Sequence, residues 1–270
     1  MENTHEAEIS LTQSISLILL FFKFMFNLVY DGSLKGYFSC VFDIYAEKIT
    51  FEDFYERGIN YSLIQREELF VEPDDAKSKR IENKIVKVCG RDEIYKIRYA
   101  LKSCDKQKEK KILEYLKLIF DNKPAPEMLN EAAVIAFNDL HKRVSHEQAR
   151  LAGFIRFMET QSGIYYAYIT PDNDVTALLM PHFIERFNGQ QFIIHDVSRN
   201  IFGLFNGKEA YVLKQDESIK FDLQLTEREE LVQKLFKQYY NDITIPERKN
   251  TRLKDNWMPR RYAKNMFETR

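Results

Sequence analysis

The sequence predicts an α+β protein with a central, mostly antiparallel sheet, packed helices and a helical insertion or subdomain at about residues 74–150. Two observations support this prediction. Short aromatic and β-branched runs separated by turn signals fill residues 153–205, as is typical of strands. Apolar side chains recur at helical spacing through residues 74–146 instead. We therefore expect one α+β domain over residues 25–270.

The middle of the sheet is predicted from residues 153–199. Residues 154–157 and 164–169 are short strand-like runs, and a helical pattern follows at 175–187. Another buried-looking strand follows at 191–194. A helix between two strands of one sheet is the economical arrangement of such a segment.

Local turn and capping signals predict two further elements. Asn206-Gly207 lies between two apolar runs, which is a strong hairpin signal. Thr226 and Glu229 have the spacing of a capping box at the start of a helix over 230–240.

The N-terminal part predicts a strand at 26–30, a turn at Asp31-Gly32-Ser33 and a helix over 34–48. Asp31 and Ser33 lie where a helix N-terminus could meet a phosphate or a base. The alternative is that they only cap the helix.

Residues 1–24 are predicted to be an extension outside the core. The apolar run from Leu11 is interrupted by Lys23 and Asn27, too early for a spanning helix, and the acidic leader does not resemble a signal peptide. We expect a protein that does not contact a membrane and that stays folded when residues 1–24 are deleted. Three scattered cysteines suit a cytoplasmic protein with reduced thiols.

Composition and motifs exclude several classes of function. The net charge is −1, so any binding to nucleic acid must rest on local patches. The chain has no Walker loop, HExxH, CxxC or GxSxG motif, and no GxGxxG after a strand. We expect no cofactor and no metal.

Two groups of residues remain as candidates for function. His182, His195 and Asp196 could form a metal site or an acid/base pair, although two histidines more often make structural hydrogen bonds. The last segment, 245–270, is cationic with interleaved aromatic residues, which suits a phosphate backbone and unstacked bases, or else only aids solubility. Its cations and aromatic residues are Arg248, Lys249, Arg252, Lys254, Arg260, Arg261, Lys264, Arg270, Trp257 and Tyr262.

Several blocks together resemble a family of bacterial DNA-metabolism or DNA-repair proteins. The blocks are YDGSLKGYFSCVFDIY at 30–45, GFIRF at 153–157, YYAYITPDNDVTALLMPHFIERF at 165–187, FIIHDVSRN at 192–200 and ERKNTRLKDNWMPRRY at 247–262. In that family the gene typically neighbours one for a radical-SAM protein, and the domain also occurs fused to a uracil-DNA glycosylase. Members often carry histidines where this chain has Ala149 and Asn173.

The resemblance implies a role in DNA metabolism. Our leading hypothesis is a DNA-binding accessory factor that presents damaged or single-stranded DNA to a radical-SAM partner enzyme. A nucleic-acid-processing hydrolase and a protein-interaction scaffold are the alternatives. The hydrolase would use His182, His195, Asp196 and Asp31. The residues expected to contact nucleic acid are Ser33, Arg156, Arg199, Arg248, Arg252, Trp257, Arg260, Arg261 and Tyr262, with Trp257 or Tyr262 stacking on a base.

Overall fold

A computed structural model describes residues 26–59, 67–215 and 224–269. Within them, helices and two sheets form an α+β fold, which confirms the predicted class. The predicted extension at 1–24 lies outside the described residues. No described helix is both long and apolar enough to cross a membrane.

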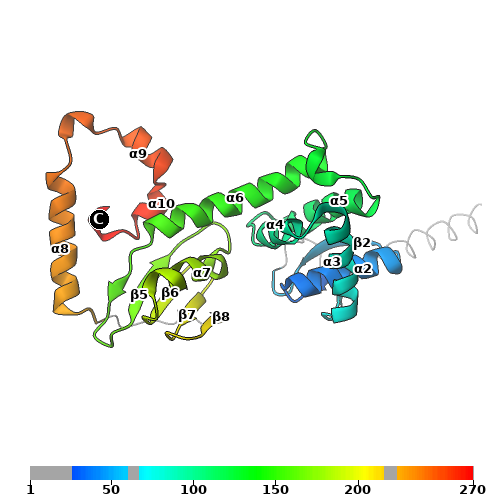
Figure 1. The fold of residues 1–270 in the computed structure, drawn as a ribbon, viewed down its shortest axis with the longest axis horizontal. Helices are drawn as coiled ribbons and strands as arrows, with labels where there is room; N and C mark the ends of the chain where they lie inside the picture. The colour runs from blue at the N-terminus through cyan, green and yellow to red at the C-terminus, as the bar shows by residue number, and fades with distance from the viewer. Residues whose placement is uncertain (1–25, 60–66, 216–223, 270) are drawn as a thin grey trace, which may run out of the picture. The chain divides into compact units, whose positions relative to one another are not determined.

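The chain divides into two compact units (Figure 1). Unit 1 comprises residues 1–101 and 105–140, and unit 2 comprises residues 102–104 and 141–270. Helix α6, Ala132–Phe154, passes from one unit to the other at Leu140. Whether the two units fold together as one domain with a helical subdomain at about 74–150 stays a prediction.

Unit 1 contains a three-stranded parallel sheet. The strand predicted at 26–30 is confirmed as its β1, although the sequence pattern did not predict a separate parallel sheet. Strands β1 (Phe26–Tyr30), β2 (Phe51–Glu56) and β3 (Glu68–Phe70) lie in the order β2-β1-β3. Helix α2 (Leu34–Ala46) connects β1 to β2. Strand β2 was missed because its sequence, FEDFYE, mixes acidic and aromatic residues without strict alternation.

The predicted helical region of unit 1 is confirmed. Helix α3 packs beside α2 (Figure 1), and the rings of Tyr115 and Phe137 stack with centroids 4.0 Å apart in the core. The helices are α3 (Asp75–Cys89), α4 (Asp92–Leu101), α5 (Lys108–Phe120), the short η1 (Ala125–Glu127) and the first part of α6.

A carboxyl group is buried in the core of unit 1. Glu109, on α5, is 1% exposed, and its Oε1 accepts a hydrogen bond from the Tyr30 hydroxyl at 3.1 Å. Burial disfavours the charged form and raises the pKa of Glu109 from its ordinary 4.5 to about 7. The fold therefore favours the neutral acid.

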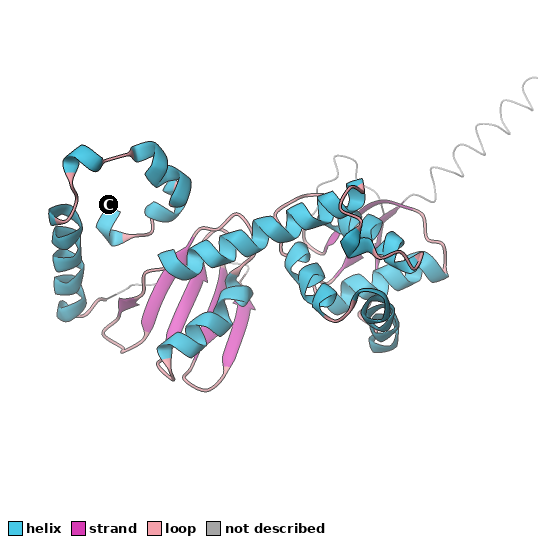
Figure 2. Cartoon of the chain, turned by 45° about the horizontal axis from the view of Figure 1, so that its top comes forward, coloured by secondary structure: helices cyan, strands magenta, loops and turns pink. Residues whose placement is uncertain are grey.

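Unit 2 is built on a five-stranded, mostly antiparallel sheet (Figure 2). Its order is β4-β5-β6-β7-β8, and only β5 and β6 pair in parallel, joined through helix α7 (Thr176–Phe187). The strands are β4 (Met158–Glu159), β5 (Tyr165–Ile169), β6 (Phe192–Asp196), β7 (Ile201–Phe205) and β8 (Ala210–Lys214).

One strand prediction in this unit is wrong. Residues 154–157 were expected to form a strand, but α6 continues to Phe154 and β4 begins only at Met158. The ring of Phe157 instead packs between the helix and the sheet, 5.0 Å from Phe183 and 5.7 Å from Phe192. Tertiary packing thus decides the conformation of this apolar run.

Helix α7 covers one face of the sheet. Phe187 packs 5.2 Å from Phe192 on this face. A Cβ on Gly203 would lie 2.5 Å from the Met180 sulfur, so glycine at this position lets α7 approach β7 closely. Because side chains alternate along a strand, His195 and its stacked neighbour Phe202 lie on the opposite face.

The hairpin and the Thr226 cap are confirmed, but the capping box is incomplete, because the Thr226 backbone N–H donates to the Glu159 carbonyl oxygen at 3.3 Å and not to the Glu229 side chain. Strands β7 and β8 pair across Asn206-Gly207, and Gly207 has a φ of +93° that favours glycine. Thr226 caps α8 (Glu227–Asp242) by accepting a hydrogen bond from the Glu229 backbone N–H at 3.0 Å. Three shorter helices follow: η2 (Pro246–Arg248), α9 (Thr251–Trp257) and α10 (Arg260–Ala263), before η3 (Phe267–Thr269).

We predict that replacing Glu109 changes how stability depends on pH. A carboxyl with a raised folded-state pKa contributes stability that is full below about pH 4.5 and is lost as the pH rises through about 7. Glu109→Gln keeps an oxygen for the Tyr30 hydroxyl and cannot ionise. Between pH 4 and pH 8 the variant should gain up to about 3 kcal/mol on the wild type in urea unfolding.

Glu114→Gln is the matched control, because Glu114 lies on the same helix with its side chain 55% exposed. It should follow the wild type at every pH. A Glu109→Gln curve parallel to that of the wild type from pH 4 to pH 8 would contradict the assignment.

Candidate functional site

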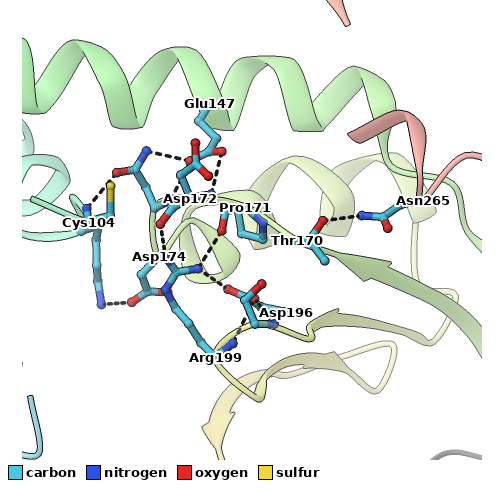
Figure 3. A network of polar contacts seen from close by, with 12 residues as sticks. Cys104, Glu147, Thr170, Pro171, Asp172, Asp174, Asp196, Arg199 and Asn265 are labelled. Carbon is cyan, nitrogen blue, oxygen red and sulfur yellow. Dashed lines mark hydrogen bonds and ion pairs between the residues drawn. The ribbon is translucent and has the colours of Figure 1, made fainter. Parts of the chain in front are cut away.

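A buried carboxylate on α6 forms the centre of a polar network in unit 2 (Figure 3). Glu147 is 3% exposed and accepts hydrogen bonds from the backbone N–H of Asp172 at 2.9 Å and of Asn173 at 2.7 Å. The Asn173 side-chain amide and the Tyr262 hydroxyl also donate to it. Burial alone would raise the pKa of Glu147, but these four hydrogen bonds outweigh burial and lower it.

The turn between β5 and α7 carries most of these donors. Asn173 Oδ1 accepts a hydrogen bond from the Cys104 backbone N–H at 2.9 Å, and Asp174 pairs with Lys102 at 2.7 Å. The turn therefore connects α6, the sheet and the segment 102–104 (Figure 3). The Asn173 side chain therefore both donates and accepts in this network.

The end of β6 contributes a second buried carboxylate. Asp196 is fully buried, pairs with Arg199 at 2.9 Å, and accepts from the backbone N–H of Ser198. Burial raises the pKa of Asp196 despite the opposing effect of the Arg199 guanidinium. Arg199 also donates to the carbonyl oxygens of Pro171 and Asp172, so it joins the network.

The C-terminal segment is anchored to the same turn. Arg261 pairs with Asp172 at 2.8 Å, and the Asn265 side chain donates to Thr170 Oγ1 at 3.0 Å (Figure 3). Arg156 pairs with Glu268 at 2.7 Å. Residues far apart in the sequence are thereby fixed to each other within unit 2.

The structure corrects the role expected of Tyr262. Its ring is 1% exposed, so it cannot stack on a base, and its hydroxyl donates to Glu147. Arg156, Arg199 and Arg261 are paired with carboxylates. These residues hold the unit together.

The structure does not bring the predicted histidines together. His182 is exposed on the outer side of α7, whereas His195 is buried on the face of the sheet away from α7. The Tyr166 hydroxyl lies 2.7 Å from His195 Nδ1, and burial lowers the pKa of His195. Among the described residues, no group of three or more His, Cys, Asp or Glu side chains could hold a metal ion.

Asp31 and Ser33 belong to unit 1. Ser33 caps α2 by accepting a hydrogen bond from the Gly36 backbone N–H at 2.9 Å, and Asp31 accepts from the Ser33 hydroxyl at 2.7 Å. Ser33 is thus the N-cap of α2 and Asp31 holds its hydroxyl, while contact of this pair with a phosphate or a base stays a prediction.

A second region of unit 2 is open. A pocket of about 590 Å³ lies between the end of α8 and α9, and we call it the cationic pocket. The indole of Trp257 on its wall is 73% exposed, and Lys254 Nζ lies 5.6 Å from the centroid of the Tyr240 ring. The residues that give the pocket its character are Tyr240, Arg248, Lys249, Asn250, Lys254 and Trp257.

The cations of this region differ from the anchoring arginines. Arg248, Lys249 and Arg252 are exposed and form no ion pair with any carboxylate of the described residues. Arg260 pairs with Asp255 at 2.9 Å, but its side chain is 82% exposed, so this pair costs little to open. The cationic pocket can therefore receive an anion with a flat ring.

Sequence reasoning singled out Trp257, Arg248 and Arg252 but missed Glu147, the centre of the network. Glu147 lies in a helical run with ordinary polar neighbours, and no local signal marks it. Only the distant partners Asn173 and Tyr262 reveal its role.

The fold and the two sites define an α+β protein with a saturated buried network and an open cationic pocket. The chain belongs to the domain family of unknown function DUF4130, whose model matches residues 106–268. The matched range contains Glu147, its four donors and the residues of the cationic pocket. Lys102 and Cys104 of the network precede this range. No curated protein matches the chain.

We predict that Tyr262→Phe destabilises the protein by about 1–3 kcal/mol, because Glu147 loses one of its four donors in a buried setting. Tyr239→Phe is the matched control, since Tyr239 is 57% exposed, and it should change stability by less than about 0.5 kcal/mol. Urea unfolding measures both. Equal, small effects of the two substitutions would show that the Tyr262 hydroxyl contributes nothing to stability.

Proposed function

We propose that this protein is a DNA-binding accessory factor that holds unpaired or damaged DNA in the cationic pocket. The observation that carries the proposal is the exposed Trp257 indole beside cations that no described carboxylate neutralises. Such a combination matches the chemistry of single-stranded nucleic acid, whose phosphates need cations and whose bases stack on aromatic rings.

The proposal assigns different roles to the arginines of unit 2. Arg199 and Arg261 lie in charge pairs with Asp196 and Asp172, and a phosphate would have to displace those carboxylates. Arg248 and Arg252 meet no such competition. Phosphate contact therefore falls on the exposed cations, and base contact falls on Trp257.

The partner is proposed from the resemblance of the sequence blocks to DNA-metabolism proteins. Those proteins are encoded beside a radical-SAM protein, so we propose that the DNA held here is presented to a radical-SAM enzyme. The separation of His182 from His195, and the saturation of Asp196 by Arg199, leave the hydrolase alternative without support from geometry.

We predict that a single-stranded oligonucleotide quenches the intrinsic fluorescence of the protein. Trp257 is the single tryptophan, so fluorescence excited selectively in tryptophan, where the tyrosines hardly absorb, reports stacking at this one ring. An oligonucleotide of equal length without bases should bind through its phosphates and leave the fluorescence nearly unchanged. Trp257→Ala should weaken binding of the normal oligonucleotide about 5- to 150-fold, measured by anisotropy of a labelled strand.

Unchanged fluorescence at saturating single-stranded DNA would show that Trp257 does not contact bases. Equal quenching by both oligonucleotides would also contradict stacking.

We further predict that the triple variant Arg248→Ala/Lys249→Ala/Arg252→Ala flattens the salt dependence of binding. Each phosphate contact adds about 0.7 to the slope of log K against log salt for a single strand, so the slope should fall by about 2. Affinity should be measured at several salt concentrations.

The matched control is Lys79→Ala/Lys87→Ala/Arg91→Ala, which removes the same charge from exposed positions of unit 1. Its slope should equal that of the wild type. Equal slopes for the wild type and both triple variants would show that Arg248, Lys249 and Arg252 do not contact phosphates and would contradict the proposal.

A further inference from the structure

Helix α8 presents an apolar stripe that its own unit does not cover. Leu231 and Leu235 are each 56% exposed, and Tyr239 is 57% exposed. Within unit 2, α8 packs on η3 through the rings of Phe236 and Phe267, 5.7 Å apart. That contact lies to one side of the stripe. Phe236 follows Leu235 by one residue, which turns its side chain by about 100° around the helix axis.

The polar residues that end this stripe have opposite charges. Arg228 precedes Leu231 by three residues, and Asp242 follows Tyr239 by three. Both are exposed, and neither forms an ion pair with any of the described residues. Residues three or four apart are neighbours on a helix surface, so the five side chains form one continuous row.

The row is symmetric about its centre. Arg228, Leu231, Leu235, Tyr239 and Asp242 are separated by three, four, four and three residues. Two such rows placed antiparallel put Leu235 opposite Leu235, Leu231 opposite Tyr239 and Arg228 opposite Asp242. This is the self-complementarity that an isologous two-fold interface requires.

We propose that α8 pairs in antiparallel fashion with α8 of a second copy of this chain, with the two-fold axis at Leu235. Two reciprocal Arg228–Asp242 ion pairs close the ends of the interface, and the leucine and tyrosine side chains fill its centre. A parallel arrangement would place Arg228 against Arg228, which the charges disfavour.

The size of the helix limits the strength of this dimer. The sixteen residues of α8 span about 24 Å. A single helix of this length buries less area than the roughly 800 Å² per partner of a standard interface. We therefore expect dissociation in the micromolar range. The proposal is independent of DNA binding, because Trp257 and Arg248 lie outside the row.

Sedimentation equilibrium between about 5 and 100 µM tests the proposal, with a monomer of 32.2 kDa as reference. The wild type should approach twice that mass. Arg228→Glu and Asp242→Arg should each weaken the dimer at least about 10-fold, because each places two like-charge pairs in the interface. The double variant Arg228→Glu/Asp242→Arg restores opposite charges and should return to within about 3-fold of the wild type.

Lys237→Glu is the matched control, since it makes the same charge change on the side of α8 that faces away from the row and should leave the dimer intact. Leu235→Glu should give a monomer with an unchanged helical circular dichroism spectrum, because the Leu235 side chain is exposed in the isolated chain. A wild type that stays at 32.2 kDa up to 100 µM overturns the proposal. An unchanged dissociation constant in both single charge-reversal variants would also overturn it. So would a double variant whose dissociation constant stays as high as that of the single variants.

Discussion

The buried carboxylate of Glu147 is the constraint on which the architecture of unit 2 depends. An ionised carboxylate away from water is costly unless several donors surround it, and here the turn after β5 and the C-terminal Tyr262 provide them. The same requirement fixes where the last segment of the chain lies. Helix, turn and C-terminal segment must be in place together for the charge to be satisfied.

This constraint separates the cations of the unit into two groups. Arg156, Arg199 and Arg261 neutralise carboxylates in or near the network and act as anchors. Arg248 ends η2, Lys249 follows it, and both line the cationic pocket. The proposed DNA contact thus rests on exposed cations, and the anchoring arginines have a structural role.

The elements that the sequence predicted are those set by local interactions. The Asn206-Gly207 hairpin and the Thr226 cap need only neighbouring residues. Elements decided by distant contacts were missed. In the run at 154–157 only Phe154 is helical and the other three residues form a loop, whereas β2 forms because β1 pairs with it. The candidate site divides in the same way, since exposed Trp257 follows from composition and buried Tyr262 does not.

Hydrogen exchange measured by mass spectrometry on Glu147→Gln tests the central claim most directly. The amide of glutamine cannot accept from all four donors, so the account predicts faster exchange in residues 171–175 and in residues 259–266 together. Faster exchange in the turn alone, with residues 259–266 protected as in the wild type, would show that another interaction holds the C-terminal segment and would contradict the account.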